Sequence, residues 1–125
     1  MALMNIRLEL GRTRTSPDGD PRRGYEFIAP LDDDGHLDAA VWRLEETNCW
    51  VRSFWPDRPD RKGWFRHVGR GWRFEYPSQD QSGQEPIFKL DRHVLSPGFC
   101  VTLTEDDGAQ LPFKIASVFP AKISA

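Results

Sequence analysis

Hydrophobic and polar residues alternate along much of this chain with a period of two. The clearest example is residues 4–10, where Met4, Ile6, Leu8 and Leu10 are separated by polar residues. Successive side chains of a β-strand point to opposite faces of the sheet, so this pattern predicts a strand with one buried face. The same reasoning predicts further strands at residues 25–29, 50–55, 63–68, 72–76, 87–90, 99–104 and 111–119.

The strands at residues 63–68 and 72–76 are predicted to form a tight hairpin. Gly69 and Arg70 suit a two-residue turn in which glycine takes the first central position. That register places Phe65 opposite Phe74 on one face, which is therefore expected to be core. The other face is expected to carry Trp64, Arg66, Arg73 and Glu75.

A second hairpin is predicted near the end of the chain. The two apolar faces coincide only if the connecting loop has an odd number of residues, because a shift by one residue reverses every side chain. A three-residue loop at 106–108, ending in a left-handed glycine, satisfies this condition. It places Val101 opposite Phe113 and Leu103 opposite Leu111.

One short helix interrupts the strands. At residues 37–46, Leu37, Val41 and Leu44 fall at helical spacing, and Asp34 is a candidate cap. Turn signals arrive roughly every 8 to 12 residues, the spacing of small barrels and sandwiches. We therefore predict a mainly β single domain over residues 1–125, a small antiparallel barrel or strongly bent sheet with one short helix.

Composition places the chain among ordinary globular domains. Of its 125 residues, 29% are charged and 12% aromatic, which argues against disorder. No apolar run approaches the ~20 residues of a membrane span, and the polar residues within residues 1–10 argue against a signal peptide. We expect a cytoplasmic location. Cys49 and Cys100 form no closely spaced pair, so both are expected to be reduced thiols.

Residues 50–76 form an aromatic-basic segment. They contain four of the five tryptophans and seven basic residues against three acidic ones, a balance of +4. Residues 26–46 carry seven acidic residues against one arginine. Either the aromatics are core and the arginines pair with these acids, or the segment is a binding face. The candidate ligand-binding residues are Arg52, Trp64, Arg66 and Arg73.

No metal or cofactor site is expected. The possible ligands are scattered one to an element, whereas zinc ligands usually cluster within two to five residues. The acidic run at residues 32–43 resembles a calcium loop, but Leu37 stands where glycine is required and Arg43 where a bidentate glutamate is required. The scattered residues are His36, Cys49, His67, His93 and Cys100.

Several stretches together resemble a family of small bacterial hypothetical proteins of about this length. They are RGYEFIAPLDDDGHLD, RSFWP, GWRFEY and PGFCVTLTEDDG with FKIASV, within residues 23–118. The resemblance implies a bacterial, cytosolic single domain and brings no activity or ligand with it. The closing PGFCVTLTEDDGAQLPFKIASV is also similar to the strand-turn-strand of SH3-like barrels.

These patterns favour a non-catalytic binding or interaction domain that uses the aromatic-basic segment to bind a protein partner or an anionic ligand. One rival is a small enzyme in which His67 or His93 works with a carboxylate. Another is a single-stranded nucleic-acid binder, in which bases stack on aromatics, but the pI of about 5.9 argues against it. The protein is expected to be a monomer, or a homodimer paired at the edge of the strand at residues 4–10.

Overall fold

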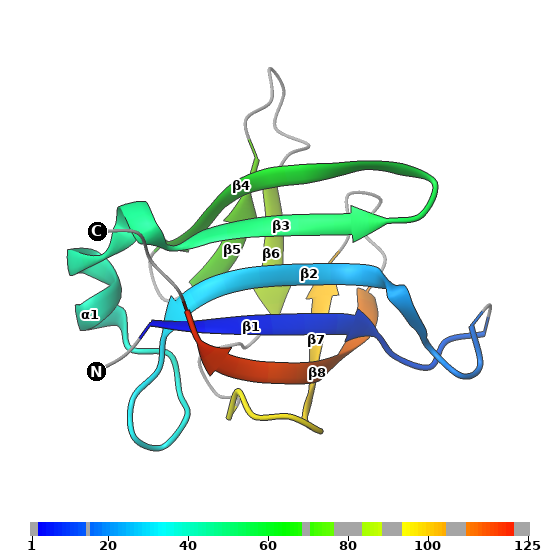
Figure 1. Cartoon of the computed structure of the whole chain (residues 1–125), viewed down its shortest axis with the longest axis horizontal. Coiled ribbons are helices and arrows are strands. Elements are labelled where there is room, and N and C mark those ends of the chain that lie inside the picture. The colour runs from blue at the N-terminus through cyan, green and yellow to red at the C-terminus, as the bar shows by residue number, and fades with distance from the viewer. Residues whose placement is uncertain are drawn as a thin grey trace.

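The described part of the chain folds into a closed barrel of eight strands (Figure 1). Each strand pairs antiparallel with the next along the chain, and the last strand pairs with the first. The predicted mainly β class with one short α-helix is therefore confirmed, in the form of a closed barrel. The computed structural model describes residues 3–14, 16–68, 71–76, 84–88, 94–104 and 110–121.

The strands follow one another around the barrel in chain order, and the helical elements lie between the second and third strands. The strands are β1 (Leu3–Leu10), β2 (Asp20–Pro30), β3 (Trp50–Trp55), β4 (Arg58–Val68), β5 (Gly71–Glu75), β6 (Gln84–Phe88), β7 (Cys100–Thr104) and β8 (Gln110–Pro120). The helical elements are α1 (Ala39–Leu44) and the short 3-10 turn η1 (Glu46–Asn48).

Both predicted hairpin registers are confirmed where the structure describes them. Phe65 lies opposite Phe74 in the β4–β5 pair. In the β7–β8 pair, Val101 lies opposite Phe113, and Leu103 lies opposite Leu111. The turns themselves, at residues 69–70 and 105–109, lie outside the described residues, so the positive φ expected at residue 108 stays a prediction.

Strand β1 has no free edge. Ile6 lies opposite Phe27 of β2 on one side and opposite Val118 of β8 on the other. A homodimer formed by edge-to-edge pairing needs unpaired backbone groups along the strand. The expectation of a dimer built at the edge of this strand is therefore wrong, because closure of the barrel uses both edges.

The interior is packed with aromatic rings. Phe65 is fully buried and stacks on Trp72, with centroids 4.9 Å apart and ring planes 11° apart. The ring centroids of Phe27 and Phe65 are 4.9 Å apart, and those of Tyr25 and Phe74 are 5.0 Å apart. Each such ring removes on the order of 150–250 Å² from water, so these contacts are a main source of stability.

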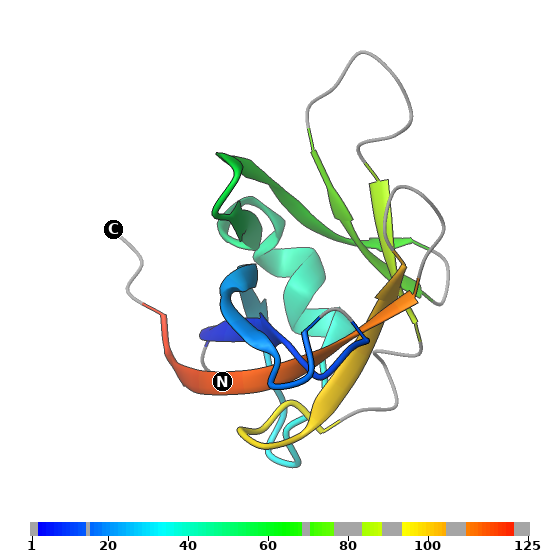
Figure 2. The same cartoon turned by 90° about the vertical axis from the view of Figure 1, so that its right-hand side faces the viewer.

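Helix α1 covers one end of the barrel (Figure 1), and Figure 2 shows it lying across the far end. It is shorter than predicted, and its cap is Asp38, whose carboxylate accepts the backbone N–H of Val41 at 3.1 Å. Asp32 organises the preceding turn instead, since its carboxylate accepts the N–H groups of Asp34 and His36. No helix in the described ranges is long and apolar enough to cross a membrane.

Trp42 attaches this helix to the barrel. Its side chain is buried, and the indole Nε1–H donates a hydrogen bond of 2.9 Å to the backbone carbonyl of Phe65. Its ring also meets the rings of His67 and Trp72 edge-on, both at 6.0 Å. One side chain therefore both closes the end of the core and satisfies a buried polar group.

Replacing Trp42 with alanine is expected to lower the free energy of unfolding by about 3–5 kcal/mol, because it opens a large cavity in the core. Leu44→Ala is the matched control, since Leu44 lies in the same helix but is 83% exposed, and it should change stability by less than about 0.5 kcal/mol. Urea denaturation followed by circular dichroism measures both. Equal effects would contradict the role assigned to Trp42.

Candidate functional site

Two tryptophans lie side by side on the outer surface of the barrel. Trp50 of β3 is directly opposite Trp64 of β4 in the strand register. Gly63 and Phe65, on either side of Trp64, are buried, so the alternation of the strand directs Trp64 outward. Trp64 is 40% exposed and Trp50 is half-buried. A pair of indoles is thus presented to solvent instead of being packed in the core.

The row of outward-facing residues that includes these tryptophans continues across β2, β1 and β8. Ile28 of β2, one position beyond the Phe27–Val51 pair, is only 3% exposed. It lies opposite Asn5 of β1, which in turn lies opposite Phe119 of β8, and Phe119 is 47% exposed. Beyond the tryptophan pair the row therefore holds buried Ile28, and polar Asn5 separates Ile28 from Phe119.

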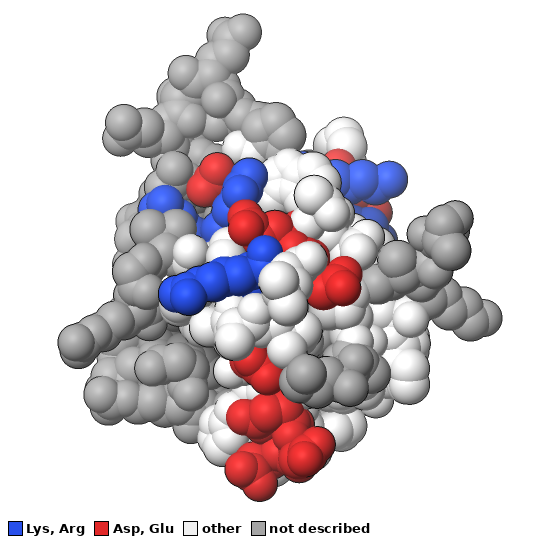
Figure 3. All heavy atoms as spheres, turned by 90° about the vertical axis from the view of Figure 1, so that its left-hand side faces the viewer, with Lys and Arg blue, Asp and Glu red and all other residues white. Residues whose placement is uncertain are grey.

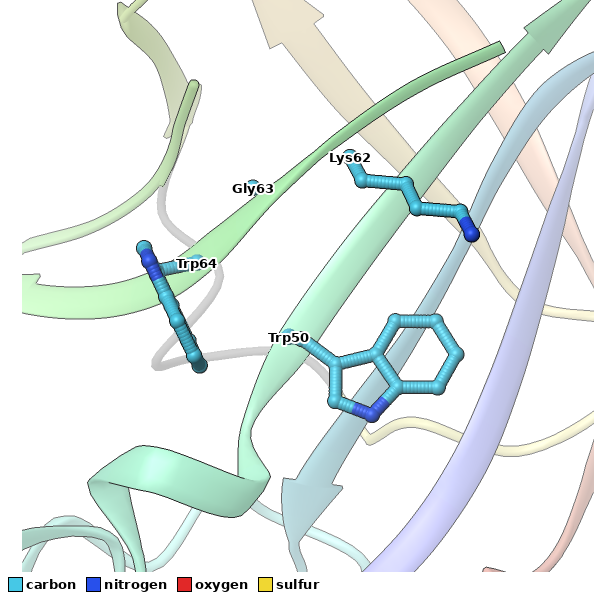
Figure 4. A pocket seen from close by; sticks show the side chains of 4 residues that line it. All are labelled: Trp50, Lys62, Gly63 and Trp64. Atoms are coloured by element: carbon cyan, nitrogen blue, oxygen red, sulfur yellow. The ribbon is translucent and has the colours of Figure 1, made fainter. Parts of the chain in front are cut away.

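Trp64 lines two neighbouring pockets and lies between them. One has a volume of about 270 Å³ and is lined by Trp50, Lys62, Gly63 and Trp64. The other has a volume of about 210 Å³ and is lined by Glu46, Thr47, Trp64 and Arg66. In Figure 4 the Trp64 ring stands away from its strand, whereas the indole of Trp50 extends from β3 over β2 and the stem of Lys62 crosses β3. A ligand can therefore contact indole and charged groups together.

Gly63 keeps β4 close to β5 beside these pockets. A Cβ atom at this position would lie 2.2 Å from the carbonyl oxygen of Glu75 and 2.9 Å from Cδ1 of Tyr76. Any larger residue would push the two strands apart. The glycine therefore contributes to the position from which Trp64 projects.

The arginines beside Trp64 are balanced by acids. Arg66 and Arg73 lie opposite each other, an arrangement that is unfavourable without neutralisation. Nε of Arg66 and Nε of Arg73 lie 3.9 Å and 3.6 Å from the carboxylate of Glu75. Glu46, from the acidic stretch before β3, lies 3.6 Å from Nη1 of Arg66. Figure 3, a view of the end that carries α1, shows acidic and basic side chains next to one another in its upper half and acidic side chains alone below them.

Arg52 belongs to a different ion-pair network on the same outer surface. Its guanidinium lies 2.7 Å from Asp60 and 3.7 Å from Glu26, and it also covers the ring of Phe54. In the register it is opposite Lys62, two positions along from the tryptophan pair. It is therefore occupied by its own acids and lines neither of the two pockets beside Trp64.

Of the four residues predicted to bind a ligand, Trp64 and Arg66 line the pockets, and Arg52 and Arg73 do not. Trp50 and Lys62 line the larger of the two pockets and were not identified from the sequence. Lys62 was missed because β4 begins at Arg58, five residues before the predicted strand. Lys62 therefore belongs to β4 and lies on the same face as Trp64.

His67 lies in the aromatic core. Its ring centroid is 4.4 Å from that of Trp72 and 6.0 Å from that of Trp42. Within the residues that the structure describes, no carboxylate contacts His67 and no group of three His, Cys, Asp or Glu residues could hold a metal ion. His93, the other predicted acid–base candidate, lies outside the described residues.

The two cysteines are free and differ sharply in environment. Cys49 is buried, and burial together with the charges of Glu45 and Glu46 raises the pKa of its thiol to about 12. Cys100 is exposed at the start of β7. Because only the thiolate is an effective nucleophile, Cys49 should be chemically inert in the folded protein.

Glu75→Gln is expected to lower the free energy of unfolding by about 0.5–1 kcal/mol at low salt, because Arg66 and Arg73 lose the acid between them. The difference from wild type should shrink near 1 M NaCl, where the screening length falls to roughly 3 Å. Asp33→Asn, an exposed acid in the turn before α1, is the control for loss of one charge. A salt-independent loss of stability would contradict the neutralising role.

Native protein at about pH 8 is expected to react with one equivalent of dithionitrobenzoate, at Cys100, and with two after denaturation. The raised pKa of Cys49 leaves almost no thiolate at that pH. Cys100→Ser should abolish the native reaction and keep one equivalent after denaturation. Reaction of native Cys100→Ser at the wild-type rate would show that Cys49 is accessible and ionised.

Comparison of the chain with protein-family models, with curated proteins and with solved structures finds no match. The resemblance to small bacterial hypothetical proteins therefore stays a prediction. The geometry of the site consists of two opposed tryptophans and a pocket on each side of Trp64. On the surrounding surface most cations already have acidic partners.

Proposed function

We propose that this protein is a non-catalytic binding domain whose site is the outer face of β3 and β4 around Trp50 and Trp64. The supporting observation is the 40% exposure of Trp64 between two pockets. Indoles provide large apolar contact area at low entropic cost and are enriched at the centres of binding sites. Two of them side by side on a sheet face, with charged groups at the rim, suit partner recognition.

The residues of this face favour binding over acid–base chemistry. Its carboxylates, Glu46 and Glu75, are engaged with arginines. The histidine nearest in sequence, His67, lies among core rings on the other side of β4. The enzyme alternative would need a catalytic pair in the parts of the chain that include His93.

A protein partner or an organic anion suits the face better than a nucleic acid. Binding to a phosphate backbone relies on several cations that are available together. Here Arg52 and Arg66 already have acidic partners within 4 Å, so phosphates would compete with carboxylates at both. The free state of Cys49 and Cys100 suits work in a reducing compartment, and we infer the cytoplasm.

The test is selection of a phage-displayed library of linear random peptides on immobilised protein. Selected peptides should bind Trp64→Ala at least about tenfold more weakly than wild type, because truncating a central tryptophan typically costs more than 1 kcal/mol. Phe99→Ala is the matched control, since Phe99 is 53% exposed and lies just before β7, outside the row of residues that contains Trp50 and Trp64. Peptides that bind both variants equally would overturn the proposed site.

A further inference from the structure

We propose that the larger of the two pockets takes an acidic segment of an extended peptide, with an apolar side chain against Trp50 and Trp64 and a carboxylate at Lys62. This inference rests on the proposed function and names the chemistry of the partner. In this inference Lys62 binds the negative charge of the ligand, whereas the sequence alone pointed to Arg52, Arg66 and Arg73.

The charge balance of the outer face leaves Lys62 available. Arg52 is paired with Asp60 and Glu26, and Arg66 is shared between Glu46 and Glu75. Lys62 is exposed and makes no ion pair with any residue in the described ranges. The pocket that Lys62 lines therefore carries a local positive charge, and a partner complementary to it brings an anion.

The rest of the same pocket is apolar and has room for a ring. Its walls include the indoles of Trp50 and Trp64, and its volume is about 270 Å³. A protein cavity of roughly 150 Å³ already accommodates benzene. An aromatic or large aliphatic side chain therefore fits between the indoles with space remaining for the adjoining backbone.

The spacing of these groups matches an extended peptide. Lys62 and Trp64 are two residues apart on β4, which corresponds to about 7 Å along a strand. Alternate side chains of an extended peptide are separated by the same distance and lie on one face. An acid and an apolar residue two positions apart can thus meet Lys62 and the tryptophans together.

The closed barrel decides how such a peptide is held. Both neighbours of β4, namely β3 and β5, are hydrogen-bonded to it, so it has no free edge for strand addition. The peptide must therefore lie on the outer face, running along β4, and be bound through its side chains. Beyond Trp64, the neutral pair of Glu46 and Arg66 in the second pocket can accept a polar side chain of the same peptide.

The experiment is a nuclear magnetic resonance titration that follows the indole Nε1–H signals of 15N-labelled protein. The probes are Ac-Asp-Gly-Phe-NH2, its reverse Ac-Phe-Gly-Asp-NH2, and the same peptides with Asn for Asp. At low salt the tighter of the two acidic peptides should bind about fivefold more tightly than its Asn counterpart, as expected for one exposed charge pair. Lys62→Gln should remove this difference, whereas the control Lys114→Gln, an exposed lysine of β8, should retain it.

Equal affinity of the Asp and Asn peptides, or a difference that survives in Lys62→Gln, would overturn the inference. Binding of 3-phenylpropionate as tightly as the acidic peptide would also overturn it, because the occupant would then be a small acid. If the titration fails but peptides from the library still need Trp64 for binding, only the proposed chemistry of the partner is rejected. Loss of Trp64 dependence in the library would reject the proposed function itself.

Discussion

The pairing of β8 with β1 is the contact on which the rest of the structure depends. It joins segments from the two ends of the described chain and turns a row of hairpins into a closed barrel. Closure encloses the aromatic core and removes the free edges at which sheets recruit other strands. Recognition of a partner is therefore left to the outer faces of the strands and to the ends of the barrel.

Strand β4 shows how one alternating sequence supplies both the core and the proposed site. Phe65 points inward, stacks on Trp72, and offers its backbone carbonyl to Trp42. Trp64, the preceding residue, points outward and separates the two pockets. Because the same strand is fixed from inside by packed rings, the exposed indole is presented from a rigid element, which lowers the entropic cost of binding.

Charge balance shapes the site as much as the aromatic residues do. The aromatic-basic segment and the acidic stretch before it meet through Glu46 and Arg66, so part of the charge asymmetry in the sequence is cancelled within the fold. Glu75 neutralises the facing pair of Arg66 and Arg73 from the same sheet. Arg66 and Arg73 therefore have acidic partners, as one alternative from the sequence required, and Trp64 stays exposed on the same face; binding at this face stays a proposal.

Local patterns in the sequence determined the strand character and two hairpin registers. The pairs Phe65–Phe74 and Val101–Phe113 follow from alternation and turn length alone, because neighbouring strands leave few registers that keep both apolar faces together. Proline was a less reliable guide. Pro59 lies within β4, whereas the strand predicted from the sequence begins only at residue 63 and so excludes Lys62. Proline is tolerated where the ladder does not need its missing N–H.

Only the tertiary structure decided which tryptophans are buried and which cations are available. The predicted register places Trp64 on the face opposite Phe65 and Phe74, but it does not say whether that face is covered; in the fold Trp64 is 40% exposed, whereas Trp72 is 4% exposed. That difference arises from strand orientation in a closed barrel, which requires contacts between residues far apart in the chain. The acids that occupy Arg52 and Arg66 likewise come from other segments, Glu26 and Glu46 among them. Local sequence fixes the faces of a strand, but long-range packing fixes what lies against each face.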